Sequence, residues 1–229
     1  MNIKKLGITL AAVMLFAMNA VQVQAGSWGV GVKIDMHSLD SDVSEDIDSN
    51  GTVNERASYN DKAMAASVFV ERNIETGFGN IALGVNYVPF EVDIDKRSIS
   101  QSSVKAVANG AATTGTNYVK GTVSNHYTVY VQPGFNVGPN LVYLNFGLSF
   151  ADVEGSNNSI SSTNITSTKN LEGTQIGIGL KKDMGDRGYL KLEYSETDYD
   201  QVSWTTSNST KGMADLDDSV VSLSLGKEF

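Results

Sequence analysis

The sequence predicts an all-β fold, a closed antiparallel eight-stranded transmembrane β-barrel with short turns at one end and four long loops at the other. Three observations predict this fold. Apolar residues alternate with small or polar residues in segments of roughly ten residues, which is the length and period of a tilted strand with one lipid-facing side. The connections between these segments are alternately short and long. The chain also ends within such a segment, on an aromatic residue.

Each predicted strand carries apolar residues on one face and small or polar residues on the other. In the first strand, Trp28 and every second residue up to Met36 are apolar, whereas serine, glycine, Lys33 and Asp35 occupy the opposite face. Pro89 lies near the far end of the third strand, where a ladder can spare one backbone donor. The predicted strands are residues 27–36, 62–73, 80–92, 124–136, 141–152, 173–183, 188–199 and 218–229.

The connections predict the layout of a membrane barrel. Short turns, each marked by glycine, follow the even-numbered strands at residues 74–79, 137–140 and 184–187. Polar stretches without periodicity follow the odd-numbered strands and are predicted to be long loops, at residues 37–61, 93–123, 153–172 and 200–216. Outer-membrane barrels place short turns in the periplasm and long loops outside, and ring closure pairs every backbone group, as hydrocarbon requires.

A soluble β-sandwich or lipocalin-like barrel would show the same alternation with its apolar faces turned inward. Small residues dominate the faces that we assign to the interior, and they suit the crowded lumen of a small membrane barrel. Outward aromatic residues also gather near the strand ends, as the two interfaces of a membrane favour. Trp28, Phe135 and Phe229 are expected at one rim, and Tyr87, Tyr127 and Phe150 at the other.

The N-terminus has the pattern of a secretory signal peptide. Lys4 and Lys5 precede an apolar run over residues 6–21, and Val23 and Ala25 supply small residues before a cleavage site. An N-terminal membrane anchor is the alternative, but the run is shorter than the ~20 residues that a helical span requires. We therefore expect residues 1–25 to be removed and residues 26–229 to form the barrel domain.

The composition limits the partners and the chemistry. The formal net charge is −9, and it becomes −11 when Lys4 and Lys5 leave with the signal peptide (−9 − 2). Such acidity argues against nucleic acid and anionic lipid as electrostatic partners. Without cysteine, the chain forms no disulfide, thiolate metal site or cysteine nucleophile. The mean hydropathy of −0.16 suits a barrel, because only alternate residues face lipid.

The last strand carries the most specific pattern, an apolar face that comprises Val221, Leu223, Leu225 and Phe229. This ending resembles the terminal strand of bacterial outer-membrane β-barrels. The chain after residue 25 resembles the small eight-stranded outer-membrane proteins of Gram-negative bacteria, which include the transmembrane domain of outer-membrane protein A and the X-, W- and opacity-type porin-family proteins. The resemblance implies an outer-membrane location, lipid and lipopolysaccharide as surroundings, and recognition of the terminal strand by the barrel-assembly machinery. It implies no cofactor, and because the outward faces show no polar seam we expect a monomer.

Charged residues on the inward faces are the main candidates for a functional site. An eight-stranded barrel has an interior just wide enough for side chains, so these charges must pair or be hydrated. Two interpretations stay open, a salt-bridged polar plug that fixes strand register and a narrow gated pore whose ion pairs rearrange. The predicted lumen-facing charged residues are Lys33, Asp35, Glu71, Lys181, Asp183, Lys191, Glu193 and Glu228.

The first predicted loop contains a partial calcium-binding pattern. Asp46, Asp48 and Asn50 alternate and a glycine follows, as at the start of a calcium loop. The closing glutamate expected at loop position 12 is Ala57, and Glu55 comes too early. We therefore expect a solvated acidic loop and assign no metal ligand. A weak divalent-cation site shared with lipopolysaccharide is the alternative.

Catalysis has little support in the sequence. The resemblance includes barrels that modify lipid A or cleave proteins, but the chain has only two histidines, His37 and His126. His126 shares a predicted strand face with Ser124, and residues two apart on a strand lie about 6.5 to 7 Å apart, too far for direct Ser–His pairing. We expect no enzyme and no catalytic residue. A structural or cell-surface interaction role through the loops is the expected function, and a narrow channel for ions or small solutes is the alternative, followed by a lipid A-modifying enzyme.

Overall fold

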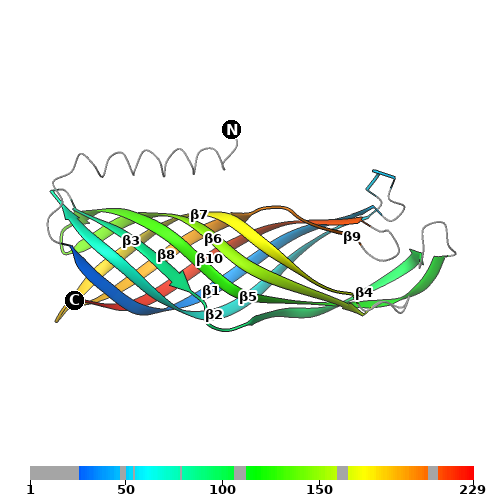
Figure 1. The fold of residues 1–229 in the computed structure, drawn as a ribbon, viewed down its shortest axis with the longest axis horizontal. Coiled ribbons are helices and arrows are strands. Elements are labelled where there is room, and N and C mark those ends of the chain that lie inside the picture. Colours follow the sequence, from blue (N-terminus) through cyan, green and yellow to red (C-terminus); the bar gives the residue numbers. More distant parts are fainter. Residues whose placement is uncertain are drawn as a thin grey trace.

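A computed structural model describes the chain at residues 26–46, 50–53, 55–77, 79–105, 112–158, 165–205 and 211–229. The predicted signal peptide, residues 1–25, lies outside the described residues. No helix in these described ranges is long and apolar enough to cross a membrane. The ten strands are β1 (Ser27–Asp46), β2 (Glu55–Thr76), β3 (Gly79–Tyr87), β4 (Val92–Lys105), β5 (Ala112–Val137), β6 (Asn140–Asn158), β7 (Ile165–Gly185), β8 (Gly188–Tyr199), β9 (Val202–Thr205) and β10 (Lys211–Glu228) (Figure 1).

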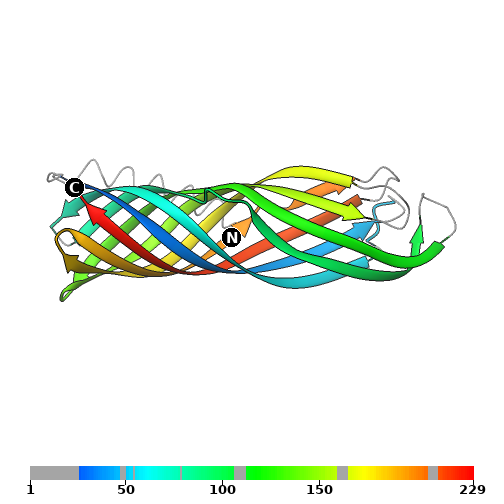
Figure 2. The same ribbon diagram turned by 90° about the horizontal axis from the view of Figure 1, so that it is seen from below.

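Eight of these strands close into a hydrogen-bonded ring, which confirms the predicted all-β fold. The order around the ring is β1, β2, β3, β5, β6, β7, β8 and β10, and every pair is antiparallel. The first and last strands close it, with pairs that run from Gly29 and Glu228 to Asp46 and Lys211. The strands wind obliquely around a long axis (Figure 2). Strands β4 and β9 lie off this ring and pair with β5 and β10 respectively.

The three predicted short turns lie together at one end, which we call the turn end. The C-terminus and the start of β1 lie at the same end (Figure 1). The turn between β7 and β8 consists of Asp186 and Arg187, which have φ angles of 49° and 61°. Two successive left-handed residues form the type of hairpin turn whose twist matches that of the flanking strands. The opposite end of the barrel, the far end, carries the long connections.

The apolar strand faces point outward, as a membrane barrel requires and opposite to a soluble protein. Around the middle of the barrel, the side chains that face the interior are mainly serine, asparagine, glutamine, tyrosine and paired charged residues, and most are buried. Exposed outward side chains from all eight ring strands form a continuous apolar surface, the lipid belt, which includes Val32, Ile34, Val68, Val70, Val85, Val129, Leu148, Ile176, Ile178, Leu192, Leu223 and Leu225.

The prediction of four long loops is wrong for most of their length. Strand β1 continues to Asp46 and β2 begins at Glu55, so the first connection is far shorter than residues 37–61. Strand β5 has 26 residues and β2 has 22, more than twice the length that a membrane span needs. The predicted loop at 93–123 is mostly the hairpin of β4 and β5. The barrel wall therefore extends well beyond the lipid belt at the far end.

The loss of periodicity in these segments has a physical cause, because the two faces exchange polarity along the strands. On β10, the outward residues Val221 and Leu223 give way to Asp217 and Asp215 toward the far end, whereas the inward side becomes apolar at Val220. Outside the lipid belt the outer surface meets water, so the apolar residues move inside. This inner apolar cluster comprises Ala151, Leu171 and Tyr199, packed against Val123, Val153, Val202 and Leu216.

Strand β3 is the one ring strand that is shorter than predicted. It ends at Tyr87 rather than at residue 92, so Pro89 lies beyond it in the segment that leads to β4. Strand β5 is bulged at the same level, where Asn125 has a φ of 52° and the backbone N–H of Val88 donates to the His126 carbonyl at 2.9 Å. Beyond the bulge, β4 replaces β3 as the partner of β5.

The loss of stability caused by a charged side chain on the outer face of β10 should depend on whether that side chain lies within the lipid belt. Leu223 lies midway along the apolar face of β10, so Leu223→Lys should destabilise the barrel by about 2–4 kcal/mol. The same substitution at Asp217, on the same face but beyond the belt, should not destabilise it. Denaturant unfolding in lipid vesicles, followed by tryptophan fluorescence, measures both. Equal unfolding midpoints for the two variants would contradict the assigned belt.

Candidate functional site

The centre of the lumen is a fully buried carboxylate. Glu71, on β2, has no exposed surface. Its Oε2 accepts hydrogen bonds from the Tyr130 hydroxyl of β5 at 2.9 Å and from the Lys191 ammonium of β8 at 2.5 Å. Its Oε1 accepts a hydrogen bond from the Tyr189 hydroxyl of β8, also at 2.9 Å. A carboxylate buried this deeply is tolerated only when its charge is paired and its oxygens are hydrogen-bonded, and both conditions are met here.

The large inward tyrosines fit because glycines face them. Tyr143 and Tyr189 are almost completely buried. A Cβ atom added at Gly179 would overlap the Tyr143 ring, and one added at Gly226 would overlap the Tyr189 ring. The small residues that the sequence places on the inward faces therefore make room for aromatic side chains of neighbouring strands.

Amide side chains extend the network across the lumen. Lys191 also donates to Gln132 Oε1 at 2.9 Å, and Gln132 Nε2 donates to Glu193 Oε2 at 3.0 Å. Asn145 Nδ2, on β6, donates to Glu193 Oε1 at 3.0 Å. Together with Glu71, these contacts join β2, β5, β6 and β8 through one polar network. We call this network, from Glu71 to Glu193, the lumen plug.

A second ion pair lies toward the turn end. Lys181 Nζ is 2.5 Å from Glu228 Oε1, and the Ser27 hydroxyl donates to Glu228 Oε2 at 3.0 Å. This pair joins β7 to the two strands that close the ring. Asp183 does not take part in this pair: it is in register with the inward Tyr189, but its own side chain is exposed. It lies beside the register shift before the β7–β8 turn, where the interior opens to water.

A third charged group lies on the far-end side of the plug. Asp35 is buried and accepts hydrogen bonds from the hydroxyls of Ser67 at 3.0 Å and Ser222 at 2.6 Å. Lys33 Nζ lies 3.1 Å from Asp35 Oδ1 and 3.9 Å from Glu193 Oε1. Lys33 thus contacts two carboxylates, and it connects this group to the plug.

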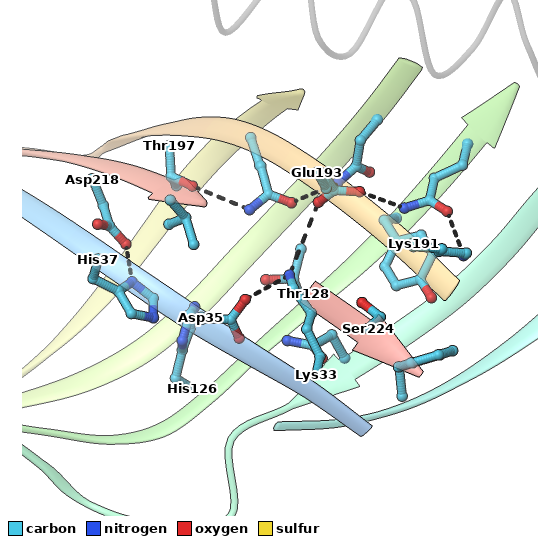
Figure 3. Close-up of a pocket in the computed structure, with 17 residues that line it drawn as sticks. Lys33, Asp35, His37, His126, Thr128, Lys191, Glu193, Thr197, Asp218 and Ser224 are labelled. Carbon is cyan, nitrogen blue, oxygen red and sulfur yellow. Dashed lines mark hydrogen bonds and ion pairs between the residues drawn. The ribbon is translucent and has the colours of Figure 1, made fainter. Parts of the chain in front are cut away.

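A cavity of about 30 Å³ adjoins these residues inside the barrel (Figure 3). Its lining includes Lys33, Asp35, Asn86, Asn145 and Asp218. The Oδ1 atoms of the two asparagines and of Asp218 are buried without a hydrogen-bond partner in the described protein. A polar cavity of this size suits about one or two water molecules.

The two histidines lie at this cavity but form no serine-based catalytic pair. His37 Nδ1 is 2.7 Å from Asp218 Oδ2, and the His126 ring is 6.5 Å from the His37 ring, centroid to centroid (Figure 3). His126 Nε2 lies 3.4 Å from the Tyr199 hydroxyl. The β5 bulge separates His126 from Ser124. Within the described residues, neither histidine has a serine hydroxyl as a hydrogen-bond partner.

The partial calcium motif forms a capped turn in its described part. The Asp46 carboxylate accepts hydrogen bonds from the backbone N–H groups of Asn50 at 3.1 Å and Gly51 at 2.8 Å. Asn50 Oδ1 in turn accepts from the N–H of Thr52 at 2.8 Å. Asp48 lies outside the described residues. The described ranges contain no group of three or more acidic or histidine side chains that could hold a metal ion.

Carboxylates on the outer wall mark where the lipid belt ends. Asp217 of β10 pairs in register with Asp40 of β1 and with Asp198 of β8, and all three side chains are exposed. Partial burial raises the pKa of the Asp217 carboxyl, and the carboxylates of Asp198 and Asp40 raise it further. Because carboxylates do not face hydrocarbon, this row lies beyond the membrane.

Seven of the eight predicted lumen charges are buried or half-buried, and these seven form four ion pairs. The uncharged partners Tyr130, Tyr189, Gln132 and Asn145 were not singled out from the sequence. Their polar side chains alternate with lipid-facing apolar residues within predicted strands, and this pattern could have indicated them. Strand pairs give no indication of which of these side chains meet across the lumen.

The predicted terminal-strand residues lie on the lipid-facing side. Val221, Leu223, Leu225 and Phe229 are all exposed on the outside of β10 or just after it. The backbone N–H of Phe229 donates to the Trp28 carbonyl at 2.8 Å, so the chain end is held against the start of β1. Recognition of this strand by an assembly machinery stays a prediction.

Comparisons with known proteins agree with this architecture. A family model described as the outer membrane protein beta-barrel domain matches residues 8–229. Among solved structures, the chain is similar to Ail, the attachment invasion locus protein of Yersinia pestis, at 12% identity and a TM-score of 0.42, covering 90% of this chain and 100% of that one. It is also similar to Neisserial surface protein A, at 12% identity and a TM-score of 0.35, covering 86% of this chain and 97% of that one. The outer membrane protein AlkL is similar at 13% identity and a TM-score of 0.44, covering 90% of this chain and 91% of that one. No curated protein sequence matches the chain.

Breaking the central ion pair should destabilise the barrel strongly. Lys191→Met leaves the Glu71 carboxylate buried without its countercharge, and we expect a loss of about 3–5 kcal/mol. The double variant Glu71→Leu with Lys191→Met should recover part of that loss, because it leaves no uncompensated charge. Unfolding titrations in lipid vesicles measure both variants. Asp183→Asn, at an exposed carboxylate, is the control, and a Lys191→Met variant as stable as this control would refute the role of the pair.

Proposed function

The chain belongs to the outer membrane β-barrel protein family, and we propose that it is a structural and cell-surface interaction protein of the bacterial outer membrane. In this proposal the turn end faces the periplasm and the far end faces the exterior. Residues 1–25 serve as a cleaved signal peptide that directs export, and residues 26–229 form the barrel domain. The barrel acts as a monomer, without a cofactor and without catalysis.

The observation that carries the proposal is the lumen plug. Its carboxylates, amides and the Lys191 ammonium hydrogen-bond to one another across β2, β5, β6 and β8, which supports a rigid scaffold rather than an open pore. At the far end, the wall extends beyond the lipid belt and has an inner apolar cluster of its own. A rigid β-structure that projects from the membrane is a suitable platform for contacts at the cell surface.

The outer surface indicates the kinds of partner involved. Polar and acidic side chains cover the outside of β1, β8 and β10 beyond the lipid belt. We propose lipopolysaccharide as the immediate neighbour of this surface, with divalent cations bridging its phosphates and these carboxylates, because direct contact of the two anionic surfaces would be repulsive. During biogenesis, the apolar face of β10 would be presented to the barrel-assembly machinery.

A narrow gated channel is the second candidate, and the position of Lys33 favours it. This ammonium lies within 4 Å of both Asp35 and Glu193, so it can exchange between two carboxylates without losing all of its countercharge. Such an exchange would change the contacts of Glu193 in the lumen plug and leave no charge without a partner.

Conductance in planar bilayers separates the two candidates. For a plugged scaffold, we expect refolded protein to be electrically silent, with heat-modifiable gel migration as the control for folding. Discrete openings that change in Lys33→Gln would contradict the scaffold proposal and establish the gated channel. Lys33 is suitable for this test because it is half-buried, so its substitution should perturb folding less than a change at Glu71.

The signal peptide is tested by the mature N-terminus. Protein extracted from outer membranes should begin at Gly26, because cleavage follows the small residue Ala25. N-terminal sequencing gives the answer directly. A mature chain that retains Lys4 and Lys5 would contradict export by cleavage.

A further inference from the structure

The barrel wall has a gap in its hydrogen bonding between β2 and β4. Strand β3 pairs with β2 only from Val68 to Thr76. Beyond Tyr87 the chain turns away, and β4 then pairs with β5 and not with β2 in the described part of the sheet. The edge of β2 from Lys62 to Ser67 therefore faces β4 without a ladder between them. An unpaired edge presents backbone N–H and C=O groups that need other partners.

A cavity of about 260 Å³ lies in this gap. Four consecutive residues of β2, Ala63 to Ala66, line one side, and Val88 and Phe90 line the other. Because successive strand residues point to opposite faces, a cavity lined by four in a row lies against the edge of β2. It is therefore a groove within the wall, and we call it the β2–β4 groove.

The β2–β4 groove opens on the lipid side and has a floor on the lumen side. Met64 and Phe90 are 71% and 62% exposed, and they lie at the mouth of the groove. Ala65 and Val88 are only 7% and 3% exposed, and they form the floor. Met64 pairs in register with Met36, another exposed apolar residue, so the mouth is continuous with the lipid belt.

We propose that the β2–β4 groove binds one acyl chain of a surrounding membrane lipid. The alanine, valine, methionine and phenylalanine lining suits an alkyl chain, and the small alanine side chains leave room for it. The ester groups at the head of that chain, and water beside them, supply hydrogen-bond partners for the unpaired edge of β2. This inference goes beyond the proposed function, since it concerns the wall and not the lumen or the far end.

Charge at the groove favours a lipid over a free fatty acid. Glu91 is exposed and lines the groove together with Asp93, which accepts a hydrogen bond from the Thr122 hydroxyl at 3.0 Å. The carboxylate of a free fatty acid would lie beside these two acidic residues and be repelled. An ester-linked chain carries no charge at that depth. Free amphiphiles are therefore a distinguishable outcome of the test.

Nuclear Overhauser contacts between lipid and protein methyl groups test the proposal. The protein is reconstituted in nanodiscs of protiated phosphatidylcholine, with labelled alanine and valine methyl groups. Ala65 and Val88 should show cross-peaks to lipid methylene protons, although both are buried. Ala82 is the internal control, because it is equally buried on the lumen side of β3 but lies outside the groove, and it should show none. Cross-peaks from Ala65 and Val88 to water alone, or to neither, would refute the proposal.

Two matched variants separate binding from general lipid contact. Ala66→Phe adds a large side chain at the lipid-facing side of the groove and should abolish the Val88 cross-peak to lipid. Val85→Phe adds the same side chain to the lipid-facing side of β3, away from the groove, and should leave that cross-peak unchanged. Folding of both is checked by heat-modifiable migration. Equal cross-peaks in the two variants would overturn the proposal, as would loss of the wild-type cross-peak on addition of perdeuterated laurate, because a free fatty acid would then be the preferred occupant.

Discussion

Hydrocarbon offers no hydrogen-bond partner to the backbone, and the rest of this structure depends on that constraint. Ring closure between β1 and β10 pairs the first strand with the last and so removes the two edges of the sheet. The short turns, the antiparallel order and the placement of the start of β1 and the end of β10 at the turn end are consistent with that closure. The gap beside β2 begins where the β2–β3 pairs end at Val68, on the far-end side of that ladder.

Water and lipid impose opposite polarities on the same strands. Within the lipid belt, the outer faces are apolar and the lumen contains charges, tyrosines and amides. Beyond the Asp40, Asp217 and Asp198 row, the outer faces are polar and the interior holds the apolar cluster around Leu171 and Tyr199. The far end is therefore organised like a soluble barrel that continues a membrane barrel, and the strands pass from one solvent to the other without a break.

The charged lumen couples strands that are distant along the chain. Glu71 and Lys191 are separated by 120 residues, and Lys181 and Glu228 by 47. Each pair is acceptable in the interior because hydroxyls and amides complete its hydrogen bonds. We propose that such a network specifies strand register as well as filling the lumen. The long inward side chains require glycines on facing strands, which ties the composition of one strand to that of its neighbours.

The sequence by itself determined the number of ring strands, the three turns, the lipid-facing residues and most of the lumen charges. These features depend on a period of two and on turn chemistry, which are local. It did not determine the strands beyond the membrane, because the exchange of polarity between faces removes the apparent period at Leu39, Val220 and similar positions. Nor did it determine the partners of Glu71, the exposure of Asp183 or the β2–β4 groove. Only the tertiary structure decided these, because shear and strand bulges set which residues of different strands meet across the barrel.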